Sequence, residues 1–184
     1  MDLGTAIASS WSSGISMYGV AALLGIAGRV GWTDAPEVLE GTPVVAIAVA
    51  LWLFELVVDK IPFVDSVWDA VHTVLRPAAG AAIALAAEGV SIGDLALATT
   101  GGVLALSAHL AKASLRLLVN VSPEPFTNIA VSTSEDGVVA GLMALALTFP
   151  ELALALTILV AFVSVIVAVA AFRIARRITR RFTG

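Results

Sequence analysis

Long apolar stretches alternate with short polar interruptions along this chain, and the pattern predicts an all-α protein without strands. Several apolar stretches approach the roughly 20 residues that a helix needs to cross a bilayer. Prolines and acidic residues mark the interruptions, where helices are expected to end. We therefore expect a polytopic transmembrane helix bundle with about six membrane segments: Ser13 to Val30, Pro43 to Val58, Val64 to Ala87, Asp94 to Val119, Thr127 to Phe149 and Pro150 to Phe172.

The segment before the first expected crossing does not have the pattern of a secretory signal. Residues 1–14 lack a basic n-region, and their first charged side chain is Asp2. We expect this segment to begin a helix that lies partly at the membrane interface.

The third expected helix carries a polar stripe in its first half. Asp65, Asp69, His72 and Arg76 follow one another at steps of four, three and four, which places them on one helix face. Pro77 comes next and should kink or break the helix. Ionisable side chains inside a membrane usually face the bundle interior or a wet cavity. The stripe is therefore interpreted either as a proton or ion relay or as a structural ion-pair network.

The fifth expected helix also begins polar and finishes apolar. Its polar residues fall on one side: Asn128, Ser132, Glu135 and Asp136. They are expected to form the second wall of a polar cavity facing helix three, and the alternative is a partly exposed helix start. Arg76 is expected to pair with Asp69 or with the two acidic residues of helix five, because an unpaired arginine at mid-bilayer is costly.

His109, Lys112 and Arg116 share one face near the end of the fourth helix. The favoured interpretation is a helix end whose basic side chains reach the cytoplasmic surface. The alternative is contact with an anionic lipid headgroup or an anionic substrate.

An internal repeat is predicted when the chain is shifted against itself by 61 residues. Leu56 to Pro62 then lies over Leu117 to Pro123, and Asp59 meets Asn120. The predicted repeats cover 43–90 and 104–149 within a single domain of residues 1–184, flanked by an N-terminal and a C-terminal helix. Repeats with polar, interrupted helices occur in many transporters, where the substrate site lies between the repeats.

Two topologies are compatible with this repeat. If helices three and five span fully, six crossings result. If they reverse at Pro77 and Gly137, they form re-entrant hairpins and place Lys112 and Arg116 outside, against the positive-inside trend. Six crossings are favoured. The arginines at 173–181 then place the C-terminus in the cytoplasm, with the acidic loop from Asp34 to Glu40 on the far side of the membrane.

Composition supports a membrane protein. The chain is 59% hydrophobic and 13% charged, against about 25% charged residues in ordinary globular proteins. It has no cysteine, which excludes thiolate chemistry, and its net charge of −4 does not favour nucleic acid. A divalent metal at Asp65, Asp69 and His72 is chemically reasonable but has no specific spacing signature, and no cofactor is expected.

Five sequence segments together resemble a family of small bacterial integral membrane proteins known as DUF4126, a domain of unknown function. They are DKIPFVDSVWD, RPAAGA, HLAKASLR, NVSPEPFTN and SEDG. The resemblance implies membrane localisation and a helical bundle. It implies no activity, substrate or catalytic residue.

The predicted function is a transporter or channel-like protein for a small solute or ion, with its site between helices three and five. Asp59, Asn120, His109, Lys112 and Arg116 are secondary candidates for that site. The alternatives are a lipid-handling protein, favoured by a groove open sideways to lipid, and a non-transporting scaffold, favoured by a fully paired, dry stripe. No enzyme motif is present. The expected partners are membrane lipids, a solute or ion, and a second copy of the chain.

Overall fold

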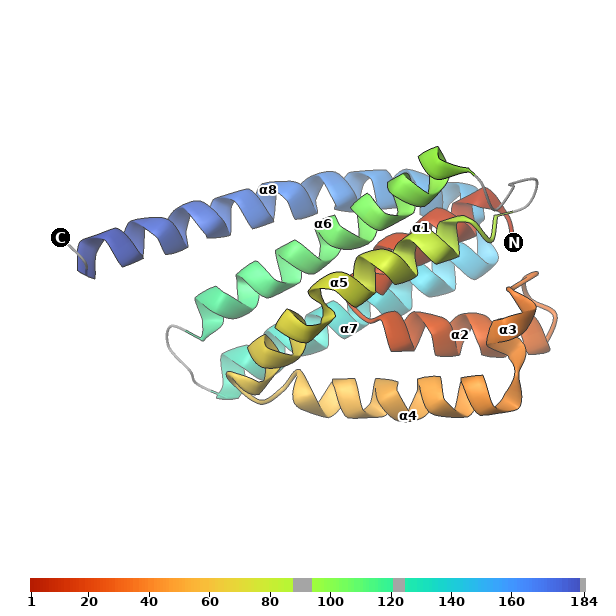
Figure 1. The fold of residues 1–184 in the computed structure, drawn as a ribbon, viewed down its shortest axis with the longest axis horizontal. Coiled ribbons are helices and arrows are strands. Elements are labelled where there is room, and N and C mark those ends of the chain that lie inside the picture. The colour runs from red at the N-terminus through yellow and green to blue at the C-terminus, as the bar shows by residue number, and fades with distance from the viewer. Residues whose placement is uncertain (88–93, 121–124, 183–184) are drawn as a thin grey trace.

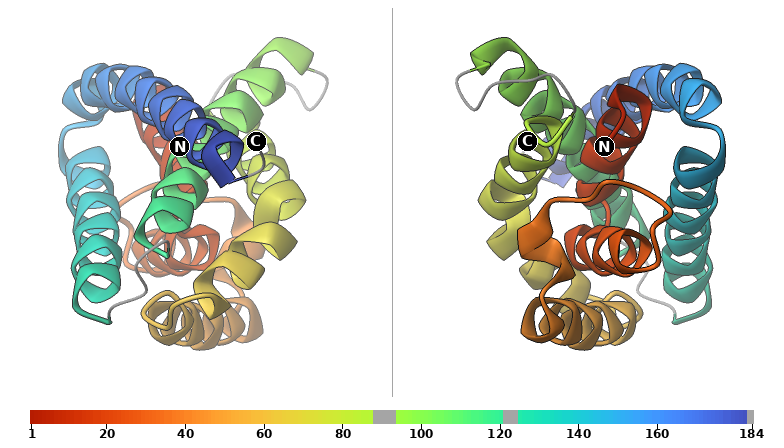
Figure 2. Two further views of the ribbon diagram at one scale, coloured as in Figure 1. Left: turned by 90° about the vertical axis from the view of Figure 1, so that its left-hand side faces the viewer. Right: turned by 90° about the vertical axis from the view of Figure 1, so that its right-hand side faces the viewer.

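Eight helices make up the part of the chain that the computed structural model describes, residues 1–87, 94–120 and 125–182, and no strand occurs in these ranges. Their arrangement is shown in Figures 1 and 2. The helices are α1 (Leu3–Ser13), α2 (Met17–Arg29), α3 (Glu37–Glu40), α4 (Thr42–Val58), α5 (Val64–Ala84), α6 (Leu95–Val119), α7 (Pro125–Thr148) and α8 (Pro150–Phe182). The all-α prediction is confirmed for these residues.

The short helix α1 lies at the centre of the bundle, where it contacts α5, α6, α7 and α8. Around it, α6 packs against both α5 and α8, and α2 packs against α4 (Figures 1 and 2). We expected α5 and α7 to pack directly through their polar halves, but α5 packs chiefly against α6 and α1. Side chains of α6 bridge the two polar faces instead, as described below.

The first expected crossing, Ser13 to Val30, is two helices rather than one. Gly14 ends α1, and the Ser16 side chain caps α2 by accepting a hydrogen bond from the backbone of Gly19. Every residue of α1 after Leu3 is buried, so this helix lies inside the bundle rather than on its surface. The cause is its small side chains, which allow close packing: a Cβ atom on Gly14 would lie 2.0 Å from the Ala105 carbonyl oxygen.

Helices α1 and α2 form a hairpin whose turn lies inside the bundle. Three close contacts trace its path. Gly4, near the start of α1, lies against Pro150 at one end of the bundle, and Gly14, in the turn, lies against Ala105 of α6. Gly28, near the end of α2, lies beside Glu40. In Figure 1 the N-terminus and the end of α2 accordingly lie toward the same end. With 11 and 13 residues, the two helices are about 17 and 20 Å long, short of a hydrocarbon core of about 30 Å.

Helix α5 continues through Pro77, and α7 continues through Gly137, so neither reverses as a re-entrant hairpin. The expected break at Pro77 is absent, and α5 ends at Ala84. Close packing on α6 supports this stretch: a Cβ on Gly101 would lie 2.3 Å from the Gly80 carbonyl oxygen. The expected helix end at 88–89 and the predicted proline turn at 123 lie outside the described residues.

The surface of the bundle is apolar and its interior holds charge. On α5, Val67, Val71 and Val74 are 67%, 63% and 76% exposed, while all four residues of the predicted stripe are buried. Helices α6, α7 from Phe126, and α8 to Ile174 are long and apolar enough to cross a membrane. This inverted distribution is that of a helical membrane protein.

Candidate functional site

Arg76 is completely buried and holds two carboxylates from different helices. Its guanidinium donates to Glu55 of α4 at 2.8 Å and to Asp69 of its own helix at 2.9 Å. It also donates to the carbonyl of Gly14 at 3.3 Å, and Nδ1 of His109 lies 3.0 Å away. We call Arg76, Glu55 and Asp69 the Arg76 group. The predicted pairing of Arg76 with Asp69 is confirmed.

Arg116 of α6 is the centre of a second cluster, the Arg116 group, formed with Asp59, Asp65 and Glu135. Its guanidinium donates to the Glu135 carboxylate, to the Asp59 carbonyl and to Oδ1 of Asn128 at 3.0 Å, and it lies 3.4 Å from Asp65. One guanidinium therefore joins the polar faces of α5 and α7. It occupies the position where sequence predicted a direct contact between those helices.

Lys112 connects the two groups. Its ammonium donates to the Asp59 carboxylate and lies 3.8 Å from the Asp69 carboxylate. It also donates at 3.0 Å to the carbonyl of Ile15, in the turn of the α1–α2 hairpin. Carbonyls at a helix end need partners when they are buried. Lys112 and Arg76 satisfy the turn carbonyls of residues 15 and 14, so the charged network also holds the hairpin in place.

His72, the third member of the predicted stripe, is buried outside the ion pairs. Its Nδ1 lies 2.8 Å from the Trp68 carbonyl, and its Nε2 lies 3.0 Å from the Tyr18 hydroxyl. A carbonyl only accepts, so Nδ1 carries a hydrogen and donates it to Trp68. The rings of Trp68 and His72 have their centroids 4.2 Å apart.

The remaining predicted residues lie at the edge of the network. Lys60 donates to Asp136 at 3.2 Å and to Ser132 at 3.3 Å, and this ion pair is partly exposed. Asn120 donates to Asp65 at 3.0 Å. The structure therefore brings the acidic residues of α7 to Arg116 and Lys60, and the alternative pairing of Arg76 with them does not form.

Two parts of the site differ from the sequence predictions. His109, Lys112 and Arg116 were expected at a cytoplasmic helix end, but all three are buried. Lys112 and Arg116 pair with carboxylates from other parts of the chain, and His109 lies beside Arg76 and Thr73. Glu55 was not among the predicted site residues. Its sequence signal, which could have identified it, is that it is a single carboxylate within the apolar run of α4. The contribution of the hairpin turn had no comparable sequence signal.

Among the described residues, no group of three or more His, Asp or Glu side chains has a geometry that would hold a metal ion. The metal site considered at Asp65, Asp69 and His72 is therefore not formed. Asp65 lies beside Arg116, Asp69 beside Arg76, and His72 beside Tyr18.

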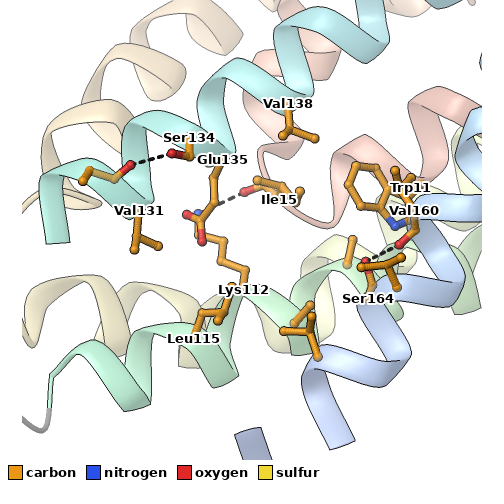
Figure 3. Close-up of a pocket in the computed structure, with 15 residues that line it drawn as sticks. Trp11, Ile15, Lys112, Leu115, Val131, Ser134, Glu135, Val138, Val160 and Ser164 are labelled. Carbon is orange, nitrogen blue, oxygen red and sulfur yellow. Dashed lines mark hydrogen bonds between the residues drawn. The ribbon is translucent and has the colours of Figure 1, made fainter. Parts of the chain in front are cut away.

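A cleft of about 480 Å³ borders the network between α1, α6, α7 and α8 (Figure 3). Its walls are mostly apolar, and they include exposed residues such as Val138 and Val163, so the cleft opens onto the apolar surface of the bundle. Two buried polar atoms at the cleft residues have no partner: Nε1 of Trp11 and Oε1 of Glu135. The cleft is thus an apolar recess that ends on a half-satisfied carboxylate.

A second, smaller cavity of about 230 Å³ lies between α5 and α6. Asp69 and Thr73 line it, and Oδ2 of Asp69 is buried without a hydrogen-bond partner. The two cavities therefore approach the network from opposite sides of α6. Neither of these two cavities lies directly between α5 and α7.

Comparison with known proteins gives a family but no characterised relative. The family described as "Domain of unknown function (DUF4126)" matches residues 3–170. No curated protein and no solved structure matches this chain. The matched residues include the Arg76 group, the Arg116 group and all the residues that line the cleft. The chain belongs to the DUF4126 family of unknown function.

Proposed function

We propose that this protein is a membrane transport protein whose substrate is an amphipathic molecule taken from the bilayer. The observation that carries the proposal is the cleft among α1, α6, α7 and α8, which opens between lipid-facing side chains and ends at Glu135. Its volume of about 480 Å³ lies in the range of small-molecule sites, about 300–1,000 Å³. An apolar body would occupy the recess, and a polar group would meet the Glu135 carboxyl group at its end.

This proposal keeps the transport class predicted from sequence and changes the kind of solute. A water-soluble solute or ion would need a polar path between α5 and α7, where Arg116 and its partners fill the space. A sideways opening instead favours a molecule dissolved in the bilayer, which was the condition set for the lipid-handling alternative. We propose a non-enzymatic role, with the charged network as a fixed wall along which the polar group moves.

The cleft can be tested by filling it. Ser164→Phe places a large ring on a buried wall residue of α8, whereas Val165→Phe places the same ring on the exposed neighbouring position, which does not line the cleft. Vesicles containing each variant would be labelled with a photoreactive long-chain alcohol, and the labelled peptides mapped. We expect Ser164→Phe to weaken cleft labelling about tenfold, equivalent to about 1.4 kcal/mol.

Val165→Phe should label like the unchanged protein, because its ring points into lipid. Equal labelling of the cleft walls in both variants would show that the recess is not a binding site. Loss of labelling in both would show that the label follows bilayer packing rather than the cleft.

We further propose five crossings, α4 to α8, and one α1–α2 hairpin inserted from the far side of a bacterial cytoplasmic membrane. Acidic residues gather toward the end that holds the N-terminus: Asp2 caps α1, Glu37 and Glu40 lie in α3, Asp94 caps α6 and Glu151 begins α8. The opposite end holds the C-terminus (Figure 1), with five arginines at 173–181. The positive-inside rule places that end in the cytoplasm.

The N-terminus separates this topology from six crossings. Five crossings place the N-terminus and the C-terminus on opposite sides, whereas six place them on the same side. Reporter tags at each terminus should read the C-terminus as cytoplasmic and the N-terminus as external, with the loop at 34–40 also external. A cytoplasmic N-terminus would contradict the inserted hairpin.

A further inference from the structure

The buried network contains more acid than base. Three cations lie in it, Arg76, Lys112 and Arg116, and they are surrounded by five carboxyl groups: Glu55, Asp59, Asp65, Asp69 and Glu135. Lys60 and Asp136 pair with each other at the edge and leave the balance unchanged. Five ionised carboxylates against these three cations would leave the network with two uncompensated negative charges inside the bundle.

Uncompensated charge in a medium of low dielectric constant is costly, and a buried carboxylate relieves that cost by taking up a proton. Three carboxyl oxygens are free to carry one, because Oδ1 of Asp59, Oδ2 of Asp69 and Oε1 of Glu135 are buried without partners. Each of these carboxyl groups uses its other oxygen in a hydrogen bond with a cation of the network. The network thus has an excess of negative charge, which favours protonation, and unpaired carboxyl oxygens that can hold the protons.

Of these three carboxyl groups, Glu135 is the one that lines the large cleft. Figure 3 shows the side chains of Glu135, from α7, and Lys112, from α6, reaching toward each other, with the ring of Trp11 at the opposite side of the cleft. An aromatic face attracts a cation, and a carboxylate attracts it more strongly. Oε2 of Glu135 already accepts from Arg116, so Oε1, which is buried without a partner, is the oxygen that can hold a proton.

We infer that the cleft binds a lipophilic cation in exchange for a proton of the buried network, released at Glu135. This inference rests on the proposed function and names its substrate class. When the cation enters, the O–H bond of the Glu135 carboxylic acid breaks, the proton passes to water, and the carboxylate faces the cation. The total charge is conserved, and no oxidation or reduction occurs.

The groups around Glu135 fit this exchange. From α6, Arg116 bonds its Oε2 and Lys112 lines the same cleft, while Asp59 at the end of α4 lies against both cations. From α5, Asp65 reaches the same guanidinium. Helices α1 and α8 contribute no charged side chain to the described lining of the cleft. Both cations near Glu135 thus already have other carboxylates, so an added cation meets an acidic environment.

The exchange can be measured with tetraphenylphosphonium on the full chain in lipid nanodiscs. A pH-indicator dye in weak buffer would record the protons released, and equilibrium dialysis the cation bound. We expect about one proton per cation bound and an affinity that rises about tenfold per pH unit while the acid is protonated, as linkage requires for an exchange of one for one. A neutral alcohol of similar size should bind without releasing a proton.

Glu135→Gln keeps a hydrogen-bonding oxygen for Arg116 and removes the exchangeable proton, so both proton release and tight cation binding should be lost. Asp136→Asn, at the partly exposed neighbouring position, is the matched control and should retain both. If Glu135→Gln does not fold, infrared spectroscopy of the unchanged protein decides: cation binding should bleach the C=O band of a protonated carboxylic acid.

The outcomes separate this inference from the proposed function. If the cation binds without proton release and without loss of the carboxylic acid C=O band, the exchange is wrong, but the cleft still binds an amphipathic molecule as the proposed function states. Preference for the alcohol over the cation would likewise overturn the inference alone. If neither molecule binds or labels the cleft, the proposed function itself fails.

Discussion

The Arg116→Leu variant is expected to lose most of its folded fraction. Arg116 is fully buried, and it holds side chains from α5 and α7 together with the end of α4. Removing one partner of a buried ion pair leaves uncompensated charge and costs about 3–5 kcal/mol. The folded yield in detergent, followed by size-exclusion chromatography, and the midpoint of denaturant unfolding would measure this loss.

Lys60→Leu is the matched control for Arg116→Leu. Lys60 also pairs with an acidic residue of α7, but its side chain is 33% exposed and that of Asp136 is 25% exposed. Ion pairs in contact with solvent contribute about 1 kcal/mol or less, so this change should have a small effect. If the two variants unfold at the same midpoint, the Arg116 group does not hold the bundle together.

The long helices were predicted well because their ends are encoded locally. Pro150 separates α7 from α8, and Asp94 caps α6 with its own side chain. Such signals depend on neighbouring residues and need no knowledge of the fold. The boundaries of α4 to α8 accordingly agree with the expected ones within a few residues, except that α8 continues to Phe182.

The division between α1 and α2 depends on contacts that sequence did not indicate. Ser16 caps α2 and also donates at 2.6 Å to Glu55 of the neighbouring helix α4. The turn before it is held by cations from α5 and α6. Each contact joins residues far apart in sequence. A continuous helix was the simpler local prediction, and tertiary contacts overrode it.

The site was predicted in part for a similar reason. Periodicity identified the buried face of α5, because a charged stripe between apolar faces has only one low-energy orientation in a membrane. Periodicity does not distinguish a basic helix end at the membrane surface from one buried among carboxylates. His109, Lys112 and Arg116 were therefore assigned to the surface, although the acidic residues that surround them were already known from the sequence.

The predicted repeat stays a prediction, with two local similarities in the structure. Asp59 and Asn120, which the alignment places together, each end a helix in the same backbone conformation. In both halves an ion pair joins the end of the first helix to the second helix, Glu55 to Arg76 and Arg116 to Glu135, with the charges exchanged. The helix pairs α4–α5 and α6–α7 also run in the same directions in Figure 1.

The Arg76 group should be replaceable as a whole, but not in part. Arg76→Leu alone leaves Glu55 and Asp69 buried without their guanidinium, which is expected to cost about 3–5 kcal/mol. The sequence prediction named Asp69 or the acidic residues of helix five as partners of Arg76, but Glu55 lies as close to the guanidinium as Asp69 does. Neutralising both acids, in the variant Arg76→Leu with Glu55→Gln and Asp69→Asn, should restore most of the folded yield, since replacing a complete buried ion cluster is often tolerated.

The same series assigns roles to the two groups, because the Arg76 group does not line the large cleft. Lys112 keeps its pairing with Asp59 in the triple variant, and Arg116 keeps its own partners. We therefore expect the refolded triple variant to label its cleft like the unchanged protein, whereas Arg29→Leu, at an exposed position, should change neither yield nor labelling. A triple variant that folds and no longer labels its cleft would show that both groups act as one site, with Lys112 coupling them.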